Sequence, residues 1–134
     1  TEALNALGRM HLWTDEPQAA LQLFKKAIRL DPHYARFSYI NLGQTYREMG
    51  QYEEAIETFK RIPPDGQARV NLRLELIACY TALDRMKDAA AEVAEVLKME
   101  PGFSVKKFSE TSPRKDSVHN TRFLDLLRKA GLPE

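Results

Sequence analysis

Residues 19–34 read "AALQLFKKAIRLDPHY", and this stretch decides the fold. Ala20, Phe24 and Ala27 are four and three residues apart, a spacing that places all three on one face of an α-helix. Pro32 follows and ends the helix, because proline cannot continue the helical hydrogen bonds. The stretch is either one ordinary amphipathic helix or one copy of a repeated unit. A repeated unit would direct the search for function toward a binding surface rather than an active site.

The pattern of small and large residues returns twice further along the chain. A shift of 35 residues, and then of another 34, gives three matching sets: Ala20, Phe24 and Ala27; Ala55, Phe59 and Ile62; and Ala89, Val93 and Val96. The residues before them repeat with the same period in three columns: Leu7-Gly8, Leu42-Gly43 and Leu76-Ile77; His11, Tyr46 and Tyr80; and Leu4, Tyr39 and Arg73. A fixed period of this length is typical of a repeat protein in which each unit is one supersecondary structure.

The period and the alternation of residue sizes resemble the tetratricopeptide repeat, a helix–turn–helix unit. On this resemblance we expect three repeats, at residues 1–34, 36–69 and 70–103, with Ala35 as one inserted residue. The resemblance implies an all-α fold, a right-handed superhelical stack of three helix pairs. Such a stack leaves its last face apolar, so a capping helix is expected after the third pair.

Residue size in the columns predicts how the two helices of a pair pack. Small residues such as Gly8 and Gly43 should let the helices approach closely, and large residues such as Leu7, Phe24 and Phe59 should fill the space beside them.

Three positions predict where helices begin and end. Pro17 suits the first turn of a helix. Gly50 tolerates the left-handed conformation that follows many helices. The segment "RIPPDGQ", residues 61–67, requires the preceding helix to end by Ile62.

The last 31 residues do not follow the period. Residues 104–115, "SVKKFSETSPRK", are predicted to be an irregular connector whose Phe108, together with Phe103, covers part of the third repeat. Residues 116–134 are predicted to form the capping helix, with Asp116 or Ser117 as its N-cap and Gly131 at its carboxyl-terminal stop.

A second resemblance concerns the carboxyl end. "PGFSV", residues 101–105, and "LRKAGLPE", residues 127–134, resemble the ends of bacterial class III adenylate or guanylate cyclase-like proteins, in which tetratricopeptide repeats follow a cyclase domain. The first residue, Thr1, already lies in a helical pattern. We therefore expect a fragment of a larger signalling protein, in which this chain is a regulatory part and not an enzyme.

The composition predicts neither a nucleic-acid partner nor a membrane partner. Twenty Lys and Arg residues balance nineteen Asp and Glu residues, so no strong field of either sign is expected. No apolar run approaches the ~20 residues that a membrane-spanning helix needs. One cysteine, Cys79, excludes an internal disulfide and favours a reducing compartment, which predicts a cytoplasmic location.

No catalytic or metal-binding pattern appears in the sequence. His11, His33 and His119 are far apart, and none lies at a metal-ligand spacing from Cys79. His11 occupies a column whose other members are tyrosines, so we expect it to be packed against a neighbouring helix. Cys79 lies within a predicted helix, where we expect a buried and unreactive thiol. We predict no cofactor, no metal and no enzymatic activity.

The tetratricopeptide resemblance also implies a binding surface, the concave groove lined by the first helix of each pair. Eight positions are carried over as the candidate site: Asn5, Arg9, Phe37, Asn41, Gln44, Arg47, Asn71 and Glu75. Ala78 is a ninth groove position on the third pair. Amide side chains there could pair with the backbone of an extended peptide, and arginines with a carboxylate. The alternative is a groove that is only hydrated.

One tetratricopeptide subfamily binds the acidic carboxyl tail of heat-shock chaperones through a clamp of two asparagines and three basic residues. The five clamp positions hold Asn5, Arg9, Asn41, Asn71 and Glu75, of which only Asn41 matches in kind. Glu75 would repel a carboxylate, so binding of such a tail is not expected.

The sequence thus predicts a protein–protein interaction module that binds a peptide or partner protein on its concave face. The alternative is a scaffold that self-associates or docks on its own catalytic domain. The first helix begins at the chain's first residues, and an uncovered apolar face on it would mark such a contact.

Overall fold

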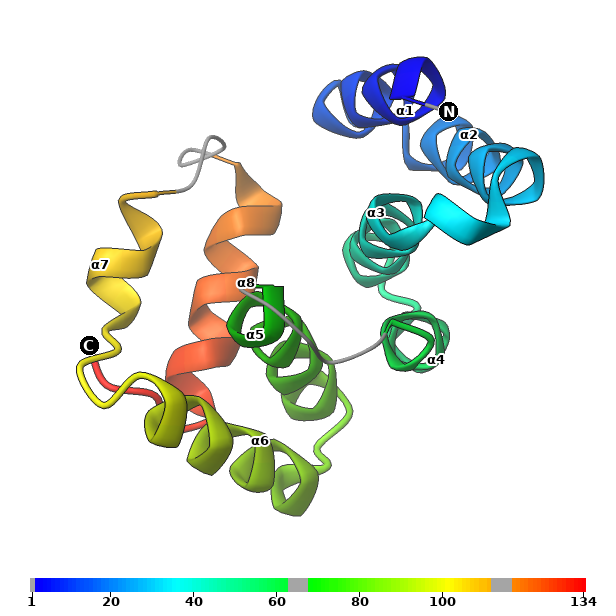
Figure 1. Ribbon diagram of the computed structural model, residues 1–134. Helices are drawn as coiled ribbons and strands as arrows, with labels where there is room; N and C mark the ends of the chain where they lie inside the picture. The colour runs from blue at the N-terminus through cyan, green and yellow to red at the C-terminus, as the bar shows by residue number, and fades with distance from the viewer. Residues whose placement is uncertain (1, 63–67, 112–116) are drawn as a thin grey trace. The chain divides into compact units, whose positions relative to one another are not determined.

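The computed structural model describes residues 2–62, 68–111 and 117–134, without the side chains of residues 34, 68 and 69. Within these residues the chain forms helices and no strand, so the predicted all-α class is confirmed (Figure 1). The helices are α1 (Glu2–Trp13), α2 (Pro17–Leu30), the 3₁₀-helix η1 (Pro32–Tyr34), α3 (Arg36–Glu48), α4 (Tyr52–Lys60), α5 (Ala68–Ala82), α6 (Met86–Met99), α7 (Val105–Ser109) and α8 (Val118–Lys129).

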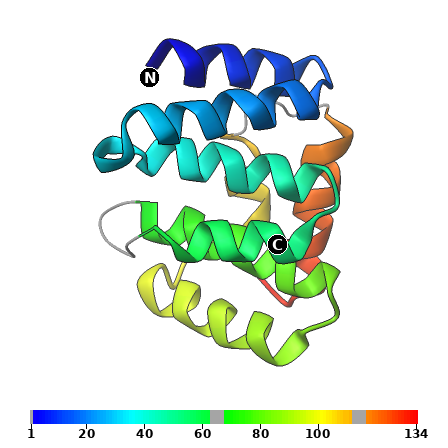
Figure 2. The same cartoon turned by 90° about the vertical axis from the view of Figure 1, so that its right-hand side faces the viewer.

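The chain divides into two compact units, Thr1–Pro63 and Pro64–Glu134. Unit 1 contains α1 to α4. There α1 packs on α2, α2 on α3 and α3 on α4, and α1 also contacts α3 (Figure 2). Unit 2 contains α5 to α8, in which α5 packs on α6 and on α8. The helices of each predicted pair are therefore neighbours in space.

Two glycines let the helices of a pair approach each other, as predicted. An added Cβ on Gly8 would lie 2.5 Å from Cε1 of Phe24, and one on Gly43 would lie 2.4 Å from Cε1 of Phe59. Both phenylalanine rings are buried in the space that the missing side chains leave. In the third pair the equivalent residues are Ile77 and Val93, which belong to one core cluster. In this pair the larger side chain lies on the first helix rather than on the second. The two side chains together are about as large as those of Gly8 and Phe24.

Leu7 does not fill a gap between helices, contrary to the prediction. Its side chain lies on the outside of α1 and is 43% exposed. The prediction failed because Leu7 precedes Gly8 by one residue, which turns it about 100° away from the buried side of the helix.

The first helix of every pair ends in the same turn. After α3, the N–H of Gly50 donates to the carbonyl oxygen of Arg47, and the N–H of Gln51 to that of Tyr46. This is the Schellman arrangement, with Gly50 at φ 79°. Asp15 and Asp84 occupy the same place after α1 and α5, with φ 61° and 60°. The left-handed position was predicted only at Gly50, because aspartate gives a weaker signal for it than glycine.

The predicted helix boundaries at Pro17 and Ile62 are confirmed. Pro17 is the first residue of α2, and α4 ends at Lys60, before the two prolines that follow Ile62.

The carboxyl-terminal helix α8 covers α5, as expected of a capping helix. Its buried Phe123, Leu124 and Leu127 join the core cluster that contains Leu74 and Ile77 of α5. Ser117 is its N-cap, with a side chain that accepts a hydrogen bond from the His119 N–H. Asp116, the other predicted N-cap, lies outside the described residues.

The segment after α6 is more regular than predicted. Phe103 and Phe108 cover the core of the third pair, as expected. However, residues 105–109 form the short helix α7 rather than irregular chain. The Ser104 side chain caps it by accepting from the Lys107 N–H at 3.2 Å, and Val105 is fully buried. This helix depends on its packing against the core, and a five-residue segment carries too little periodicity to show it.

The last residues of the chain close back onto the start of α7. The Val105 N–H donates to the Pro133 carbonyl oxygen at 2.8 Å, and the Ser104 hydroxyl donates to Glu134. Arg128 of α8 binds the Glu134 carboxylate at 2.8 Å. We call these contacts the carboxyl-terminal clasp.

Candidate functional site

The predicted groove residues of unit 1 lie on α1 and α3, and two of them bind each other. The Asn41 amide donates to Oδ1 of Asn5 at 3.2 Å, and the Asn5 amide donates to the Ser38 hydroxyl at 3.0 Å. Asn41 is buried. These amides therefore hold α1 to α3, and their hydrogen-bonding groups are partly used within the protein.

The other predicted groove residues of unit 1 remain accessible to a partner. Phe37 is the most exposed of the large apolar side chains on α3, at 71%. Arg9 is exposed, and Gln44 and Arg47 are half-buried. Phe37, Asn41 and Gln44 are spaced as i, i+4 and i+7, so they share one face of α3. We call Arg9, Phe37 and Gln44 the α1–α3 surface.

Unit 2 holds the remaining predicted positions on α5. Asn71 is exposed and Glu75 is buried. Ala78 is fully buried in the core cluster together with Phe123 and Leu124 of α8, so its prediction as a groove residue is wrong. The cap covers this part of α5, and its docking place could not be read from the repeat pattern.

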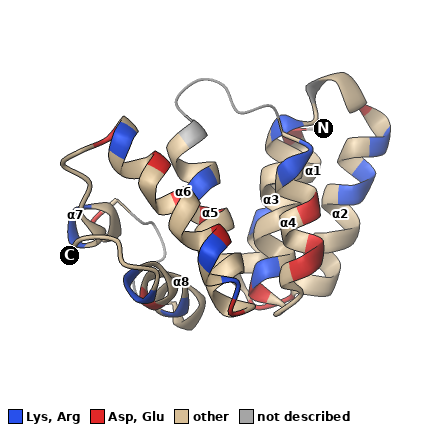
Figure 3. Ribbon diagram, turned by 90° about the horizontal axis from the view of Figure 1, so that it is seen from below, with Lys and Arg blue, Asp and Glu red and all other residues tan. Residues whose placement is uncertain are grey.

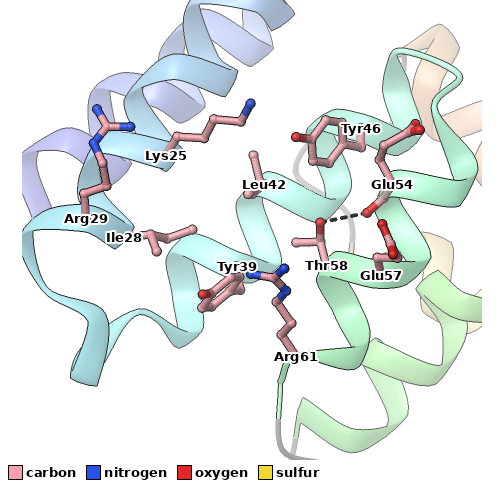
Figure 4. A pocket seen from close by; sticks show the side chains of 10 residues that line it. All are labelled: Lys25, Ile28, Arg29, Tyr39, Leu42, Tyr46, Glu54, Glu57, Thr58 and Arg61. Atoms are coloured by element: carbon pink, nitrogen blue, oxygen red, sulfur yellow. Dashed lines mark hydrogen bonds between the residues drawn. The ribbon is translucent and has the colours of Figure 1, made fainter.

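A pocket that the sequence analysis missed lies elsewhere in unit 1, between α2, α3 and α4 (Figure 4). Its volume is about 350 Å³. The lining residues are Lys25, Ile28, Arg29, Tyr39, Leu42, Tyr46, Glu54, Glu57, Thr58 and Arg61. Tyr39 and Tyr46 entered the sequence analysis only as members of packing columns, and the structure places both of them in the lining of this pocket together with the buried Leu42.

Side chains of both charge signs line this pocket. Lys25 and Arg29 come from α2, whereas Glu54 and Glu57 come from α4 (Figures 3 and 4). The Lys25 ammonium lies 5.9 Å from the centre of the Tyr46 ring, within cation–π range. Arg61, the C-cap of α4, adds a third basic side chain, so the lining carries both charge signs and would select neither an anion nor a cation.

The titratable side chains of the described residues do not gather into a metal-binding cluster. No group of three or more His, Cys, Asp and Glu side chains there could hold a metal ion, and Cys79 is buried. A hydrogen bond from Thr14, and then the bond and charge of His11, lower the pKa of Glu16. His11 reaches Glu16 at 3.1 Å and is half-buried, in partial agreement with the packed histidine predicted for its column. None of the described helices is long and apolar enough to span a membrane.

The chain is similar to known proteins in its helical repeats. The family model of the tetratricopeptide repeat matches residues 14–71. Lipopolysaccharide assembly protein B of Escherichia coli is 32% identical over 92 residues in strains K12, O6:H1 and O157:H7. These alignments cover 68% of this chain and 22% of each relative, so the chain spans about a fifth of the length of the curated relatives it matches.

The family match begins at the turn after α1 and ends within α5, and thus includes all of α2, α3 and α4. In this stretch α2 packs on α3 and α3 on α4, and Gly43 of α3 lies against Phe59 of α4. Residues 14–71 therefore match the tetratricopeptide repeat, and the described residues have the all-helical fold of a helical repeat protein.

Proposed function

We propose that the chain is a protein–protein interaction module that binds an extended segment of a partner on the α1–α3 surface. A tetratricopeptide-repeat match supports an interaction role in general. The observation that carries the specific proposal is Phe37, an aromatic side chain left 71% exposed on a face whose neighbouring amides are fixed by the Asn5–Asn41 bond. Aromatic and arginine side chains are both enriched in protein interfaces.

The partner's chemistry follows from the residues on this surface. Phe37 would receive an apolar side chain, and Arg9 would bind a carboxylate elsewhere on the same segment. Gln44 would pair with the backbone of the segment. Asn5 and Asn41 would mainly keep the surface rigid, because their amides already bind each other.

A peptide selection on the full chain tests the proposal. Twelve-residue peptides displayed on phage are selected on the immobilised chain, and the enriched peptides are measured by calorimetry. We expect Phe37→Ala and Arg9→Ala each to weaken binding by about tenfold or more, since interface anchors contribute over 1 kcal/mol each. Leu30→Ala is the matched control, because Leu30 is also a large exposed apolar residue, on α2. Equal loss in all three variants, or loss in none, contradicts the proposal.

A second candidate function is docking of this chain on another helical body, either a second copy or another part of a larger protein. The exposed apolar residues of α1, among them Met10 and Trp13, favour it. Light scattering from low to high micromolar concentration tests self-association. A mass near twice 15.4 kDa that returns to the monomer value in Met10→Glu supports it, and a monomer throughout excludes a second copy.

The origin of the chain in a cyclase-like signalling protein and its cytoplasmic location stay predictions. The first rests on residues 101–105 and 127–134, and the second on the single cysteine. The relatives are named for lipopolysaccharide assembly. Cleavage of a nucleoside triphosphate by the isolated chain would contradict its predicted lack of enzymatic activity.

A further inference from the structure

The pocket between α2, α3 and α4 lies on the opposite side of α3 from the α1–α3 surface. Each residue of an α-helix is turned by about 100° from the one before it. Tyr39 of the pocket is therefore turned about 200° from Phe37, and Leu42 is turned about 200° from Gln44. A ligand in the pocket would leave the α1–α3 surface open, so the two sites are separate.

Five charged side chains line the pocket, and they do not neutralise one another. They are Lys25, Arg29, Glu54, Glu57 and Arg61. Within the described part of the chain none of the five has an ion-pair or side-chain hydrogen-bond partner. Arg85 and Arg128, by contrast, each bind a carboxylate, at 3.0 Å and 2.8 Å. The charges around the pocket are therefore available to a ligand.

The antiparallel course of α3 and α4 sets the order of these charges along the pocket. The turn at Gly50 folds α4 back along α3, so residues equally far from Gly50 lie level with each other. Glu54 is level with Tyr46, and Arg61 is level with Tyr39 (Figure 4). We call the two ends of the pocket the Glu54 end and the Arg61 end.

The two ends suit groups of opposite charge. Arg29 lies one helical turn beyond Lys25 on α2, toward the Arg61 end. The Arg61 end thus carries basic groups alone and suits a carboxylate. Glu57 adds a second carboxylate between the Glu54 end and the middle, so this part suits a cation. Lys25 competes little there, because its ammonium faces an aromatic ring at 5.9 Å.

The middle of the pocket suits an apolar group. Leu42 is buried there and Ile28 is half-buried. The Thr58 hydroxyl donates to the Glu54 carbonyl oxygen at 2.7 Å, so its proton is already used. The volume of about 350 Å³ is small for a ligand pocket and is enough for one large side chain and its neighbours.

We infer that this pocket binds an extended segment of a partner protein in which a basic, a large apolar and an acidic residue occupy alternate positions. A ligand with one charge sign would meet a like charge at one end of the pocket. A neutral ligand would cover the charged groups without replacing their water. The inference goes beyond the proposed function, because it adds a second site that recognises a different segment.

The spacing of the charges favours a segment over a single small zwitterion. Glu54 and Arg61 are seven residues apart on α4, which places their backbone positions about 10 Å apart. This distance exceeds the separation of the ammonium and carboxylate groups of one amino acid. Alternate side chains of an extended chain share one face, and the outer two of three such residues are about 13 Å apart. The residue between them would lie over Leu42.

A nuclear magnetic resonance titration of the isotope-labelled full chain tests the inference, because it detects weak binding and locates it. The probes are free phenylalanine and three peptides with blocked ends: Lys-Ser-Phe-Ser-Glu, Lys-Ser-Phe-Ser-Lys and Glu-Ser-Phe-Ser-Glu. We expect the first, mixed peptide to shift the amide signals of Ile28, Leu42 and Thr58. It should bind about fivefold or more tightly than the other two peptides, in which one attraction is replaced by a repulsion.

A charge reversal at Arg61 tests the assignment of the basic end. Arg61→Glu should lower the preference for the mixed peptide over the two-lysine peptide by about fivefold or more. Lys26→Glu is the matched control and should leave this preference unchanged. Lys26 is exposed and precedes Arg61 by the 35-residue repeat period, but it is not in the pocket lining. Both variants change the net charge equally.

Other results overturn the inference. These are equal binding of the three peptides, no shift at millimolar peptide, and equal effects of Arg61→Glu and Lys26→Glu. Free phenylalanine that binds as tightly as the mixed peptide would assign the pocket to a small zwitterion, and pocket signals that move on dilution of the chain alone would assign it to a second copy. Phe37→Ala should leave binding of the mixed peptide unchanged, so a failure of the α1–α3 surface is distinguishable from a failure of this pocket.

Discussion

Gly8 lies directly against the ring of Phe24, and a methyl group on Gly8 would come within 2.5 Å of ring atom Cε1. The Phe24 ring is fully buried. The contact recurs between Gly43 and Phe59, where the separation would be 2.4 Å. The close approach of the two helices in each of these pairs therefore depends on the absence of a side chain at one position.

Gly8→Ala and Gly43→Ala are each expected to destabilise the chain. Alanine gains up to about 1 kcal/mol of helix propensity over glycine, but forcing a methyl group into a packed core costs about 1–3 kcal/mol. Overpacking should prevail, because both rings are enclosed. Urea denaturation measures the net change in the free energy of unfolding. Gly102→Ala is the control, since a methyl group at Gly102 meets nothing within 4 Å. Stabilisation by Gly8→Ala would show that the ring can move aside.

In the third pair, two substitutions can restore the combination of a glycine and a phenylalanine that the other two pairs contain. Ile77→Gly should open a cavity and Val93→Phe should overpack the same cluster, so that each destabilises the chain by itself. The double variant should recover part of the loss, with a coupling of about 0.5–3 kcal/mol, because it restores the sizes found at Gly8 and Phe24. A double-mutant cycle on urea midpoints measures this coupling. Strict additivity would mean that the two side chains do not share one space.

The turn after the first helix of each pair predicts opposite effects for two substitutions. Gly50→Ala should cost about 1–2 kcal/mol, because Gly50 has φ 79° and the left-handed conformation disfavours a Cβ. Asp84→Gly should be neutral or gain up to about 1 kcal/mol, because Asp84 carries a side chain at φ 60°. Thermal unfolding followed by circular dichroism compares the two variants. A loss of stability in Asp84→Gly would mean that the aspartate side chain itself supports the turn.

Thr14→Val should raise the pKa of Glu16 toward the value of an ordinary glutamate. The hydrogen bond from Thr14 is the largest cause that lowers this pKa, ahead of the bond and charge of His11. Since the folded pKa lies below the unfolded one, the contribution of Glu16 to stability is present above the unfolded pKa and is lost as the pH falls through the folded pKa. Carbon-13 NMR titration of the carboxyl group measures the shift. Thr58→Val is the control, and an unchanged pKa in Thr14→Val would contradict the assigned cause.

The local and periodic features of the fold were predictable from the sequence. The helix pairs, the glycine-to-phenylalanine contacts, the turn at Gly50 and the N-cap at Ser117 each depend on residues that are close in sequence or related by the period. Helix α7 was not predictable, because its five residues are stabilised by burial of Val105 in a core made by other helices.

The candidate site was less accessible to prediction than the fold. The bond between Asn5 and Asn41 joins residues 36 positions apart, and it depends on the rotation of α1 about its axis as well as on residue type. Ala78 was misplaced for a related reason, because the position at which α8 docks is set by the shape of the third pair. The pocket over Leu42 reflects how two tyrosine side chains are oriented, which a column of packed residues does not specify.

The carboxyl-terminal clasp makes one amide proton a reporter of the state of unit 2. The N–H of Val105 is held by the carbonyl oxygen of Pro133, at the far end of α8. Its exchange with deuterium therefore requires either that the last two residues detach or that the cap opens, and it records the frequency of those events at a single backbone position.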